Sequence, residues 1–452
     1  MEIKLTPQQQ ENHDKIIEHL KEVQSGDIFG EHSFISLAGP AGSGKTTLLK
    51  FIVQTLLKRG WTICITAPTH QAVKVAQQTI GINDKRLKFA SLHSFLSLKP
   101  GPINVETGEQ KFVRENNKKK QSDLSKMKFD LVINDESSMV SSEMFKFIKE
   151  EMYTYNRVKS FLFTGDLFQL LAIEKDIVTT THAIYNNKDV NHYQLFEILR
   201  QKDMEVIDFV SEIRSMIKEK YTKFDLFNFL ISERDKPHNK IKFYNSKKEF
   251  IGEFIKKDNL GKTEDCIFTF TNKNVNSYNE KIRNYYVMLD GEIPEIHPSD
   301  LFVVQESTQP DNLFAQDAFI NSEILELKQS NKEVFDFKGK KFNGYKCMTT
   351  DNRKFNMISK DSEDDFNHTC KLLKANAIKT KNRENWKLYY TLKGLFLDIK
   401  YHYSSTVHKS QGSSYVNSWV DLSDLGYVEN DMLLRLFYVA CTRAKECVHI
   451  LL

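Results

Sequence analysis

The feature that most constrains this chain is the segment GPAGSGKTT, residues 39–47, which fits the pattern G-x-x-x-x-G-K-[ST]. The apolar run SFISLAG leads into it, and an amphipathic stretch over residues 45–60 follows. A glycine-rich loop between a strand and a helix N-terminus points backbone N–H groups and the positive end of the helix dipole at bound phosphate. The segment therefore predicts a nucleoside triphosphate site in an α/β fold, and an ordinary glycine-rich turn is the weaker alternative.

Roles within this loop follow from the same pattern. Lys45 is expected to reach the β and γ phosphates of the nucleotide, and the hydroxyl of Thr46 is expected to ligate Mg²⁺. Backbone N–H groups of residues 41–46 would face the phosphates. The predicted nucleotide-binding loop consists of Gly39, Pro40, Ala41, Gly42, Ser43, Gly44, Lys45, Thr46 and Thr47.

Residues 33–170 alternate short apolar runs with amphipathic stretches, which is typical of a parallel sheet covered by helices. Strands are expected at SFISLAG, WTICITAPT, FDLVINDES and SFLFTGD. The helix expected over residues 45–60 carries an apolar stripe and ends at Gly60, a favourable capping residue. This part of the chain therefore predicts one complete α/β unit.

The same alternation returns after residue 262. Strands are expected at DCIFTF, SWVDL and CVHILL, and helices are expected over residues 274–286 and 430–444. Two α/β units of one kind are the simplest interpretation.

Two segments interrupt the alternation. Residues 97–127 are polar, basic and marked by Pro and Gly, and VETGEQKFV predicts a hairpin around Thr107 and Gly108. Residues 286–400 combine strand-like pieces such as DLFVVQES and KKFNGYKCMTT with a charged helical stretch. We expect the first segment to be a small insertion and the second to be an inserted domain.

Composition excludes several classes of protein. The 64 Lys and Arg residues nearly balance the 60 Asp and Glu residues, so a nucleic-acid surface would depend on where the charges lie. No apolar run is long enough for a membrane span, the first ten residues do not resemble a secretion signal, and the six cysteines form no CxxC pair. We therefore expect a cytoplasmic protein with reduced thiols.

Two acidic residues follow a predicted strand in LVINDESSM. This strand end would lie beside the phosphate-binding loop, where Asp135 suits a Mg²⁺ ligand and Glu136 suits the base that orients the attacking water. Acidic pairs after strands are otherwise often plain loop residues. Gln169 in TGDLFQL follows the next strand and is a candidate sensor of the γ-phosphate, with a solvated loop amide as the alternative.

Two arginines are candidates for stabilising transition-state charge on the γ-phosphate. Arg443 ends an apolar helix in FYVACTRAKE, and Arg200 lies in LFEILRQ. A surface salt bridge is the alternative for either arginine taken alone. Two such motifs downstream of the phosphate-binding loop favour a two-unit NTPase.

Polar residues at predicted strand ends indicate contact with single-stranded nucleic acid. APTHQAVK, SLHSF, FTNKNV and VHKSQG place hydroxyl, amide or histidine side chains there, and such groups bind backbone phosphate and sugar. Nearby aromatic rings can stack on bases. For His93 and His408, a buried or helix-capping role is the alternative.

In this order, the motifs resemble those of the superfamily 1 helicases, and within them the RecD-like group B. The resemblance covers nearly the whole chain, and APTH, DESSM and GDLFQL favour group B because group A helicases read differently at these motifs. The matching segments in chain order are LTPQQ, GPAGSGKTT, APTHQAVK, SLHSF, INDESSM, TGDLFQL, FEILRQ, TVHKSQGSSY and LFYVACTRA.

The resemblance also implies site residues and cofactors. It implies that Gln9 reads the adenine, that Gly412 belongs to the nucleotide site, and that ATP and Mg²⁺ are the cofactors. The residues it assigns to ATP chemistry are Lys45, Thr46, Asp135, Glu136, Gln169, Arg200 and Arg443. The residues it places at the single strand are Pro68, Thr69, His70, His93, Phe112, Thr271, Asn272, His408 and Lys409.

The implied architecture is two RecA-like parallel-sheet domains with two insertions. Phe112 would stack on the junction base from a wedge hairpin, which an inserted SH3-like domain with a helical extension would brace. The implied bounds are 1–175 for the first domain with the wedge at about 97–127, 176–285 and 401–452 for the second domain, and 286–400 for the SH3-like domain.

The chain departs from the family pattern in a few places. Ser137 stands where a small apolar residue is usual, and LLAI replaces a Pro-containing run after Gln169. The wedge segment differs in length and content, which leaves the role of Phe112 open.

The expected function is an ATP-dependent DNA helicase that moves five-prime to three-prime on single-stranded DNA and unwinds duplex junctions, in replication, recombination or repair. The expected state is a monomer, with a single-strand-binding protein as a candidate partner and no membrane. A translocase that displaces proteins without unwinding, or a P-loop NTPase of another role, remains the alternative.

Overall fold

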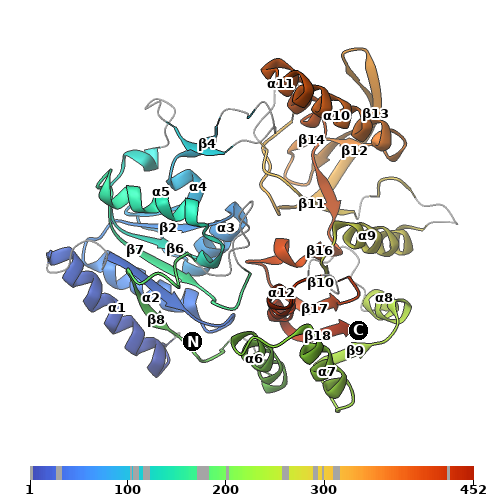
Figure 1. The fold of residues 1–452 in the computed structure, drawn as a ribbon. Coiled ribbons are helices and arrows are strands. Elements are labelled where there is room, and N and C mark those ends of the chain that lie inside the picture. The colour runs from blue at the N-terminus through green and yellow to red at the C-terminus, as the bar shows by residue number, and fades with distance from the viewer. Residues whose placement is uncertain are drawn as a thin grey trace.

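The structure is a computed structural model, and Figure 1 shows how its elements are arranged. Two α/β units lie side by side, and a third unit built on antiparallel strands lies above the second in this view. The described residues are 4–26, 33–101, 104, 111–115, 123–170, 183–199, 203–256, 264–288, 294–297, 300–308, 316–424 and 428–452.

A parallel sheet forms the centre of the first unit. Its strands are β1 (Phe34–Ala38), β2 (Ile63–Ala67), β3 (Leu87–Ser91), β6 (Phe129–Asn134), β7 (Val158–Gly165) and β8 (Val190–Gln194). They lie in the order β3-β2-β6-β7-β1-β8, and every pairing is parallel. The predicted parallel sheet is confirmed, and its two edge strands, β3 and β8, were not among the four strands that the sequence patterns predicted.

Helices cover both faces of this sheet. One face carries α1 (Pro7–Ser25), α2 (Lys45–Lys58) and α3 (His70–Ile80), and the other carries α4 (Leu92–Phe95) and α5 (Ser142–Tyr153). In α2, the buried side chains of Leu48, Ile52 and Leu56 form the predicted stripe. Gly60 follows the helix with a φ of +87°, as its capping position requires.

The order of the strands determines where the functional loops meet. Since β6, β7 and β1 are parallel neighbours, their carboxyl ends lie at one edge of the sheet. The phosphate-binding loop follows β1, the acidic pair follows β6, and the TGDLFQL loop follows β7. These three loops therefore share one crevice, as in other open α/β sheets.

A second parallel sheet forms the centre of the second unit. Its strands are β9 (Ile241–Tyr244), β10 (Asp265–Thr269), β16 (Ser404–Thr406), β17 (Tyr415–Asp421) and β18 (Ala444–Leu451). They lie in the order β16-β10-β17-β18-β9, again with parallel pairing throughout. The predicted strands at DCIFTF, SWVDL and CVHILL correspond to β10, β17 and β18.

Helices also cover both faces of the second sheet. One face carries α6 (Met204–Lys218), α7 (Lys223–Arg234) and α12 (Asn430–Thr442), and the other carries α8 (Lys247–Lys256) and α9 (Asn272–Val287). The two helices predicted for this unit correspond to α9 and α12. The chain leaves the second unit after α9 and returns to it at β16 (Figure 1).

An antiparallel sheet lies in the excursion between α9 and β16. Its strands are β11 (Leu301–Val304), β12 (Ile324–Phe337), β13 (Lys340–Thr349), β14 (Lys354–Ile358) and β15 (Ile399–Tyr401). The order is β14-β13-β12-β11-β15. Two helices, α10 (Lys360–Thr380) and α11 (Arg383–Lys393), pack against each other beside it. Strand-like and helical stretches were both predicted for this region.

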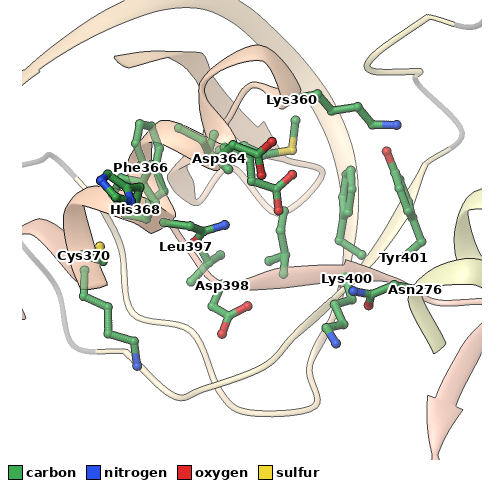
Figure 2. A pocket seen from close by; sticks show the side chains of 18 of the residues that line it. Asn276, Lys360, Asp364, Phe366, His368, Cys370, Leu397, Asp398, Lys400 and Tyr401 are labelled. Carbon is green, nitrogen blue, oxygen red and sulfur yellow. The ribbon is translucent and has the colours of Figure 1, made fainter. Parts of the chain in front are cut away.

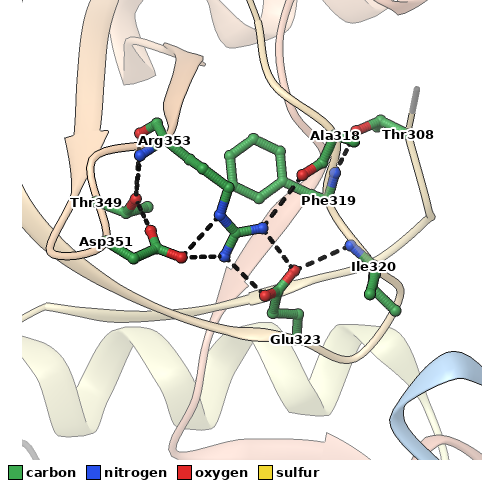
Figure 3. A network of polar contacts seen from close by, with 8 residues as sticks. All are labelled: Thr308, Ala318, Phe319, Ile320, Glu323, Thr349, Asp351 and Arg353. Carbon is green, nitrogen blue, oxygen red and sulfur yellow. Dashed lines mark hydrogen bonds and ion pairs between the residues drawn. The ribbon is translucent and has the colours of Figure 1, made fainter. Parts of the chain in front are cut away.

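Arg353 holds one corner of this third unit together (Figure 3). Its Nη2 donates to Glu323 Oε1 at 2.7 Å, and its Nε donates to Asp351 Oδ2 at 2.8 Å. Its Nη1 donates to the carbonyl oxygen of Ala318 at 3.1 Å. The hydrogen bond with Glu323 is the largest cause that raises the pKa of Arg353. The guanidinium therefore links the turn between β13 and β14 to the residues that precede β12.

A two-stranded ribbon projects from the first unit. β4 (Leu98–Pro100) pairs antiparallel with β5 (Phe112–Arg114). Residues 105–110, including the turn predicted at Thr107 and Gly108, lie outside the described residues. An antiparallel pair in this segment agrees with the predicted hairpin.

Short 3-10 turns and free thiols complete the description. The 3-10 turns are η2 (Asp123–Lys126), η3 (Ser137–Met139) and η4 (Val407–Ser410). All six cysteines are free, and four of them are buried. Among the helices that the structure describes, none combines the length and the apolar character needed to cross a membrane.

Candidate active site

The phosphate-binding loop requires glycine at specific positions. Gly42 and Gly44 have φ of +81° and +77°, in the left-handed region that favours glycine. A Cβ on Gly44 would also lie 2.4 Å from Nε2 of Gln9. At the start of the loop, a Cβ on Gly39 would lie 2.7 Å from Oγ of Ser43. The loop is therefore compact, and α2 begins directly after it at Lys45.

Lys45 lies folded over its own loop. Its Nζ donates to the carbonyl oxygens of Gly39 and Pro40, both at 2.9 Å. Thr46 and Thr47 follow at the N-terminus of α2, and both line the adjoining cavity. A triphosphate in this cavity would offer Lys45 anionic oxygens in place of the two carbonyl groups.

The acidic pair lies directly after β6. Thr164 Oγ1 donates to Asp135 Oδ1 at 2.6 Å, and the backbone N–H of Glu136 donates to the same oxygen at 3.0 Å. Glu136 adopts a left-handed conformation with φ of +53°. A strained residue of this kind persists where its surroundings hold it in place, as functional sites commonly do.

The pKa of Glu136 is raised above its ordinary value. Burial is the largest cause, and the neighbouring Asp135 carboxylate adds to it. The cationic side chains of Arg443 and Lys45 act in the opposite direction. The pKa of Glu136 therefore depends on charged side chains from both units.

The second unit contributes Arg443 from the end of α12. Its side chain is buried, and its Nη1 donates to the carbonyl oxygen of Ser413 at 3.1 Å. Its Nε donates to the carbonyl oxygen of Val439 at 3.1 Å. Gly412 precedes Ser413 with φ of +79° and, like Arg443, lines the cavity. The predicted arginine therefore lines the same cavity as the predicted phosphate-binding loop.

A single cavity of about 390 Å³ joins the two units. Most of the residues predicted for nucleotide binding and hydrolysis line it, and none of the predicted DNA-binding residues does. Arg200 lies outside the described residues. The predicted residues that line the cavity are Gln9, Ala41, Gly42, Gly44, Lys45, Thr46, Thr47, Asp135, Glu136, Gln169, Gly412 and Arg443.

Both glutamines predicted for this site are buried. Gln9 donates from Nε2 to the carbonyl oxygen of Ser43 at 3.1 Å, and its Oε1 accepts from the backbone N–H of Thr6 at 3.1 Å. Its amide therefore binds α1 to the loop, and it would have to reorient to contact adenine. Gln169 lines the cavity, and its Oε1 is buried without a hydrogen-bond partner among the described residues.

Ser137, a departure from the family pattern, has a structural role. Its Oγ donates to the carbonyl oxygen of Thr164 and lies 2.8 Å from the hydroxyl of Tyr185. Asp135 shares Thr164 as a partner. Ser137 therefore ties the loop after β6 to the end of β7, which an apolar residue in its place would not do.

In the first unit, the predicted DNA-binding residues lie together. Thr69 caps α3, with its Oγ1 accepting from the N–H of Ala72 at 3.1 Å, and the exposed His70 begins that helix. The ring centroids of His93 and Phe112 are 4.6 Å apart. Burial and the neighbouring His70 lower the pKa of His93. Pro68 is half-buried just before the cap.

In the second unit, the predicted DNA-binding residues have partners within the protein. The hydroxyl of Thr271 donates to Asp424 Oδ2 at 2.8 Å, and Asn272 Oδ1 accepts from Nζ of Lys400 at 3.0 Å. Burial lowers the pKa of His408. Lys409 donates to the side chain of Gln305, which lies directly after β11. This group therefore lies at the junction with the antiparallel sheet.

A larger hollow of about 1100 Å³ lies at the same junction, between α9, α10 and β15 (Figure 2). Asn276, Asp364 and Lys400 point toward it, so its lining carries both signs of charge. None of the residues predicted for ATP chemistry lines it. The smaller cavity, and not this hollow, therefore combines the groups that phosphoryl transfer needs.

Sequence reasoning missed two residues that join the units. Asp166 and Tyr438 are both fully buried, and their side chains form a hydrogen bond of 2.6 Å across the boundary. Both lie inside segments that were singled out, TGDLFQL and LFYVACTRA. Their position within these motifs was a signal, but their contact depends on the packing of two units.

Comparisons with known proteins agree with this site. A family model described as an AAA domain matches residues 27–226. An uncharacterised protein of Acanthamoeba polyphaga mimivirus is 26% identical over 483 residues, covering 92% of this chain and 94% of that protein. The ATP-dependent DNA helicase Dda of Enterobacteria phage T4 is 24% identical over 453 residues, covering 91% of this chain and 92% of that protein.

Solved structures show the same fold. Pif1 helicases solved for DNA unwinding at forked DNA have a TM-score of 0.51 and 19% identity, covering 99% of this chain and 92% of theirs. The Pif1 helicase from Candida albicans has a TM-score of 0.50 and 18% identity, covering 100% of this chain and 94% of that chain. The chain is therefore similar over nearly its whole length to the phage Dda helicase, and it shares its fold with Pif1 helicases.

Proposed function

We propose that this chain uses ATP hydrolysis to move five-prime to three-prime along single-stranded DNA and to unwind duplex DNA, in replication, recombination or repair. One observation carries the proposal: Lys45 and Glu136 of the first unit and Arg443 of the second unit line the same cavity. A site divided in this way is complete only when the two units close. ATP binding and hydrolysis can therefore move one unit against the other.

In this proposal, Lys45 holds the β and γ phosphates and Glu136 orients the attacking water. Arg443, and Arg200 as a second candidate, stabilises the charge that develops on the γ-phosphate. The raised pKa of Glu136 suits a group that must take up a proton. Gln169 would report the γ-phosphate, because it lines the same cavity.

Mg²⁺ would be held by the hydroxyl of Thr46 and the carboxylate of Asp135. The donor set fits this cation, because both groups are oxygen ligands on the cavity wall. Thr164 and the N–H of Glu136 orient Oδ1 of Asp135, and no hydrogen bond from the described residues reaches Oδ2. When bound, Mg²⁺ neutralises charge on the phosphates.

Single-stranded DNA would run over the strand ends of both units. In the first unit, His70, His93 and Phe112 form a cluster that offers a ring for stacking and groups for phosphate. In the second unit, the pKa of Lys400 is lowered, first by burial and then by the nearby Lys409 ammonium. A phosphate between these two amines would relieve their repulsion, which favours a polyanion at this junction.

The proposed domains follow the three units. In this proposal, the sheets that carry the predicted ATP residues form the two RecA-like domains, and the antiparallel sheet with α10 and α11 forms the inserted SH3-like domain with its helical extension. The β4–β5 ribbon would act as the wedge. The proposed first RecA-like domain is residues 1–175, with the wedge at about 97–127. The proposed second RecA-like domain is residues 176–285 and 401–452, and the proposed SH3-like domain is residues 286–400.

Unwinding would then combine movement with capture of opened pairs. Opening one step of DNA costs roughly 1.4 kcal/mol, so thermal motion opens a pair or two but not a long tract. A wedge carried by a moving motor prevents those pairs from closing again. The two ATP-site halves would alternate between closed and open states, with each unit gripping the strand in turn.

The deciding experiment is an unwinding assay on duplexes that carry either a five-prime or a three-prime single-stranded tail. We expect ATP-dependent unwinding of the five-prime-tailed substrate and little of the other. Unwinding of only the three-prime-tailed substrate would contradict the direction. Movement along single strands without unwinding of either substrate would instead support the protein-displacing translocase.

Replacing Lys45 with alanine tests the ATP site. We expect Lys45→Ala to reduce DNA-stimulated ATPase and unwinding by at least about 100-fold, because the main cation on the phosphates is lost. Single-strand binding should remain, and Lys58→Ala in the last turn of the same helix should behave like the parent. A variant that loses DNA binding but keeps ATPase would contradict the assignment.

A further inference from the structure

Asp166, in the loop after β7, carries a fully buried carboxylate with three hydrogen-bond donors. Its Oδ2 accepts from the backbone N–H of Ala41 at 3.2 Å and from the hydroxyl of Tyr438 at 2.6 Å. Its Oδ1 accepts from the backbone N–H of Phe168 at 3.0 Å. A buried carboxylate is stable only when such donors satisfy it, so its partners fix its position.

The three donors come from three functional segments. Ala41 belongs to the phosphate-binding loop, Phe168 belongs to the loop after β7, and Tyr438 belongs to α12 of the second unit. Tyr438 is itself fully buried. Burial and the Asp166 carboxylate raise the pKa of its phenol, so the hydroxyl stays protonated and donates. One carboxylate therefore connects the two units through the loop that binds phosphate.

The loop after β7 is also fastened directly to the second unit. Nη1 of Arg435 donates to the carbonyl oxygens of Leu167 and Gln169 at 2.9 and 3.0 Å. The guanidinium of Arg214 lies 4.6 Å from the ring centroid of Phe168. This loop is thus held by α12 and α6, although it continues from a strand of the first sheet.

Tyr438 and Arg443 share one rigid element. Tyr438 lies within α12 and Arg443 caps the C-terminal end of this helix five residues later, which corresponds to about 7.5 Å along a helix axis. Any shift of Tyr438 relative to Asp166 therefore also shifts Arg443 relative to the cavity. Asp166 Oδ2 accepts from both the Tyr438 hydroxyl and the N–H of Ala41, so one carboxylate oxygen links α12 to the phosphate-binding loop.

We propose that Asp166 is a positioning residue that, through its hydrogen bond to Tyr438, holds the phosphate-binding loop in register with the helix that delivers Arg443. The proposal rests on the proposed ATPase function of this cavity. Asp166 has no chemical role in it. It sets the position of Ala41 relative to α12. It thereby determines how efficiently closure of the two units leads to ATP hydrolysis.

The test is Tyr438→Phe, which removes one hydroxyl and keeps the buried ring. We expect kcat for ATP to fall about tenfold, the size expected when a net hydrogen-bond contribution of about 1.4 kcal/mol is lost. The KM for ATP and the affinity for single-stranded DNA should change less than twofold. The number of ATP molecules consumed per nucleotide travelled should rise, which loss of folding stability alone would not cause.

The matched control is Tyr278→Phe in the same unit. It removes an equivalent buried hydrogen bond, from the Tyr278 hydroxyl to Asp421 Oδ2 at 2.7 Å, on the opposite face of the second sheet. We expect this variant to lose stability but to keep the parental kcat and ATP consumption per nucleotide. Asp166→Asn turns an amide NH2 group toward at least one of the donors that Asp166 binds, so we expect it to lose at least as much kcat as Tyr438→Phe.

Two results would overturn the proposal. One is a Tyr438→Phe variant with parental kcat and parental ATP consumption per nucleotide. The other is an equal loss of kcat in Tyr438→Phe and Tyr278→Phe, which would indicate a purely structural effect. A parent whose ATPase is not stimulated by DNA would contradict the proposed function instead, and the kcat without DNA would still decide the role of Asp166.

Discussion

Glu136 is the residue whose geometry and charge can be tested most directly. Replacing it with glutamine keeps its size and removes the base, so we expect ATPase to fall by about 10²- to 10⁴-fold while ATP binding changes little. Steady-state hydrolysis and binding of a fluorescent nucleotide would measure the two effects. Glu143→Gln, on the exposed first turn of α5, is the matched control. Unchanged hydrolysis in Glu136→Gln would exclude it as the base.

The raised pKa of Glu136 also predicts a pH dependence. The base acts only when ionised, so ATPase should decline as pH falls through this raised pKa, at a pH above the 4.5 of an ordinary glutamate. Folding stability depends on pH in the opposite direction to ATPase activity. The folded protein disfavours the ionised form, so stability is present below the ordinary pKa and lost as pH rises through the raised pKa. Glu136→Gln should therefore be at least as stable as the parent at neutral pH in thermal unfolding.

At the residue scale, sequence motifs predicted where the candidate site residues would lie but not which hydrogen bonds hold them. Asp135 and Glu136 line the cavity as predicted, because the end of a parallel strand fixes them. Gln9 binds the loop carbonyl of Ser43, and Asp166 binds Tyr438. Both contacts join residues from distant parts of the chain, and no local pattern specifies such a pair.

At the element scale, the corner held by Arg353 gives a stability prediction. Arg353→Ala removes charged hydrogen bonds to Glu323 and Asp351, and we expect it to lower the free energy of unfolding of the antiparallel unit by about 1–3 kcal/mol. Amide hydrogen exchange should increase first in β13 and β14. Arg383→Ala, at the exposed start of α11, should leave exchange there unchanged. Equal protection in both variants would show that the corner does not depend on Arg353.

Helices and strands with a clear pattern of apolar residues were predictable from the sequence, and strands at the edge of a sheet were not. The helix α2 follows its apolar stripe, and β1 and β2 are mostly apolar and buried along their whole length. β8 (Val190–Gln194) was not predicted, because a partly exposed edge strand with His192 and Gln194 lacks an apolar run. The long strand β12 mixes Lys, Gln and Asn with apolar residues, since much of it is exposed. Tertiary pairing, and not local propensity, defines such strands.

At the scale of the whole molecule, the sequence predicted two alike units but could not predict their contact. The cavity exists because α12 presents Arg443 to a loop almost 400 residues earlier in the chain. Arg435 and Tyr438 on the same helix make that contact through Leu167, Gln169 and Asp166. Motif order indicates that such a cleft exists, but its hydrogen bonds depend on the packing of complete units.

At the scale of the whole molecule, replacing Phe112 tests whether the β4–β5 ribbon separates DNA strands as proposed. Its ring is 44% exposed at the start of β5 and lies beside His93, so it can stack on a base at the junction. Loss of one base–aromatic stack costs about 1–3 kcal/mol, and Phe112→Ala should therefore slow unwinding severalfold or more while movement along single strands stays close to the parental rate.

Parallel assays of duplex unwinding and single-strand translocation would separate these steps. The control is Phe224→Ala, because that ring is 70% exposed on α7 of the second unit, away from the ribbon. It should leave both rates unchanged. If Phe112→Ala slows translocation as much as unwinding, the ring grips the strand and the β4–β5 ribbon is not the wedge. If it slows neither, strand separation depends on another surface.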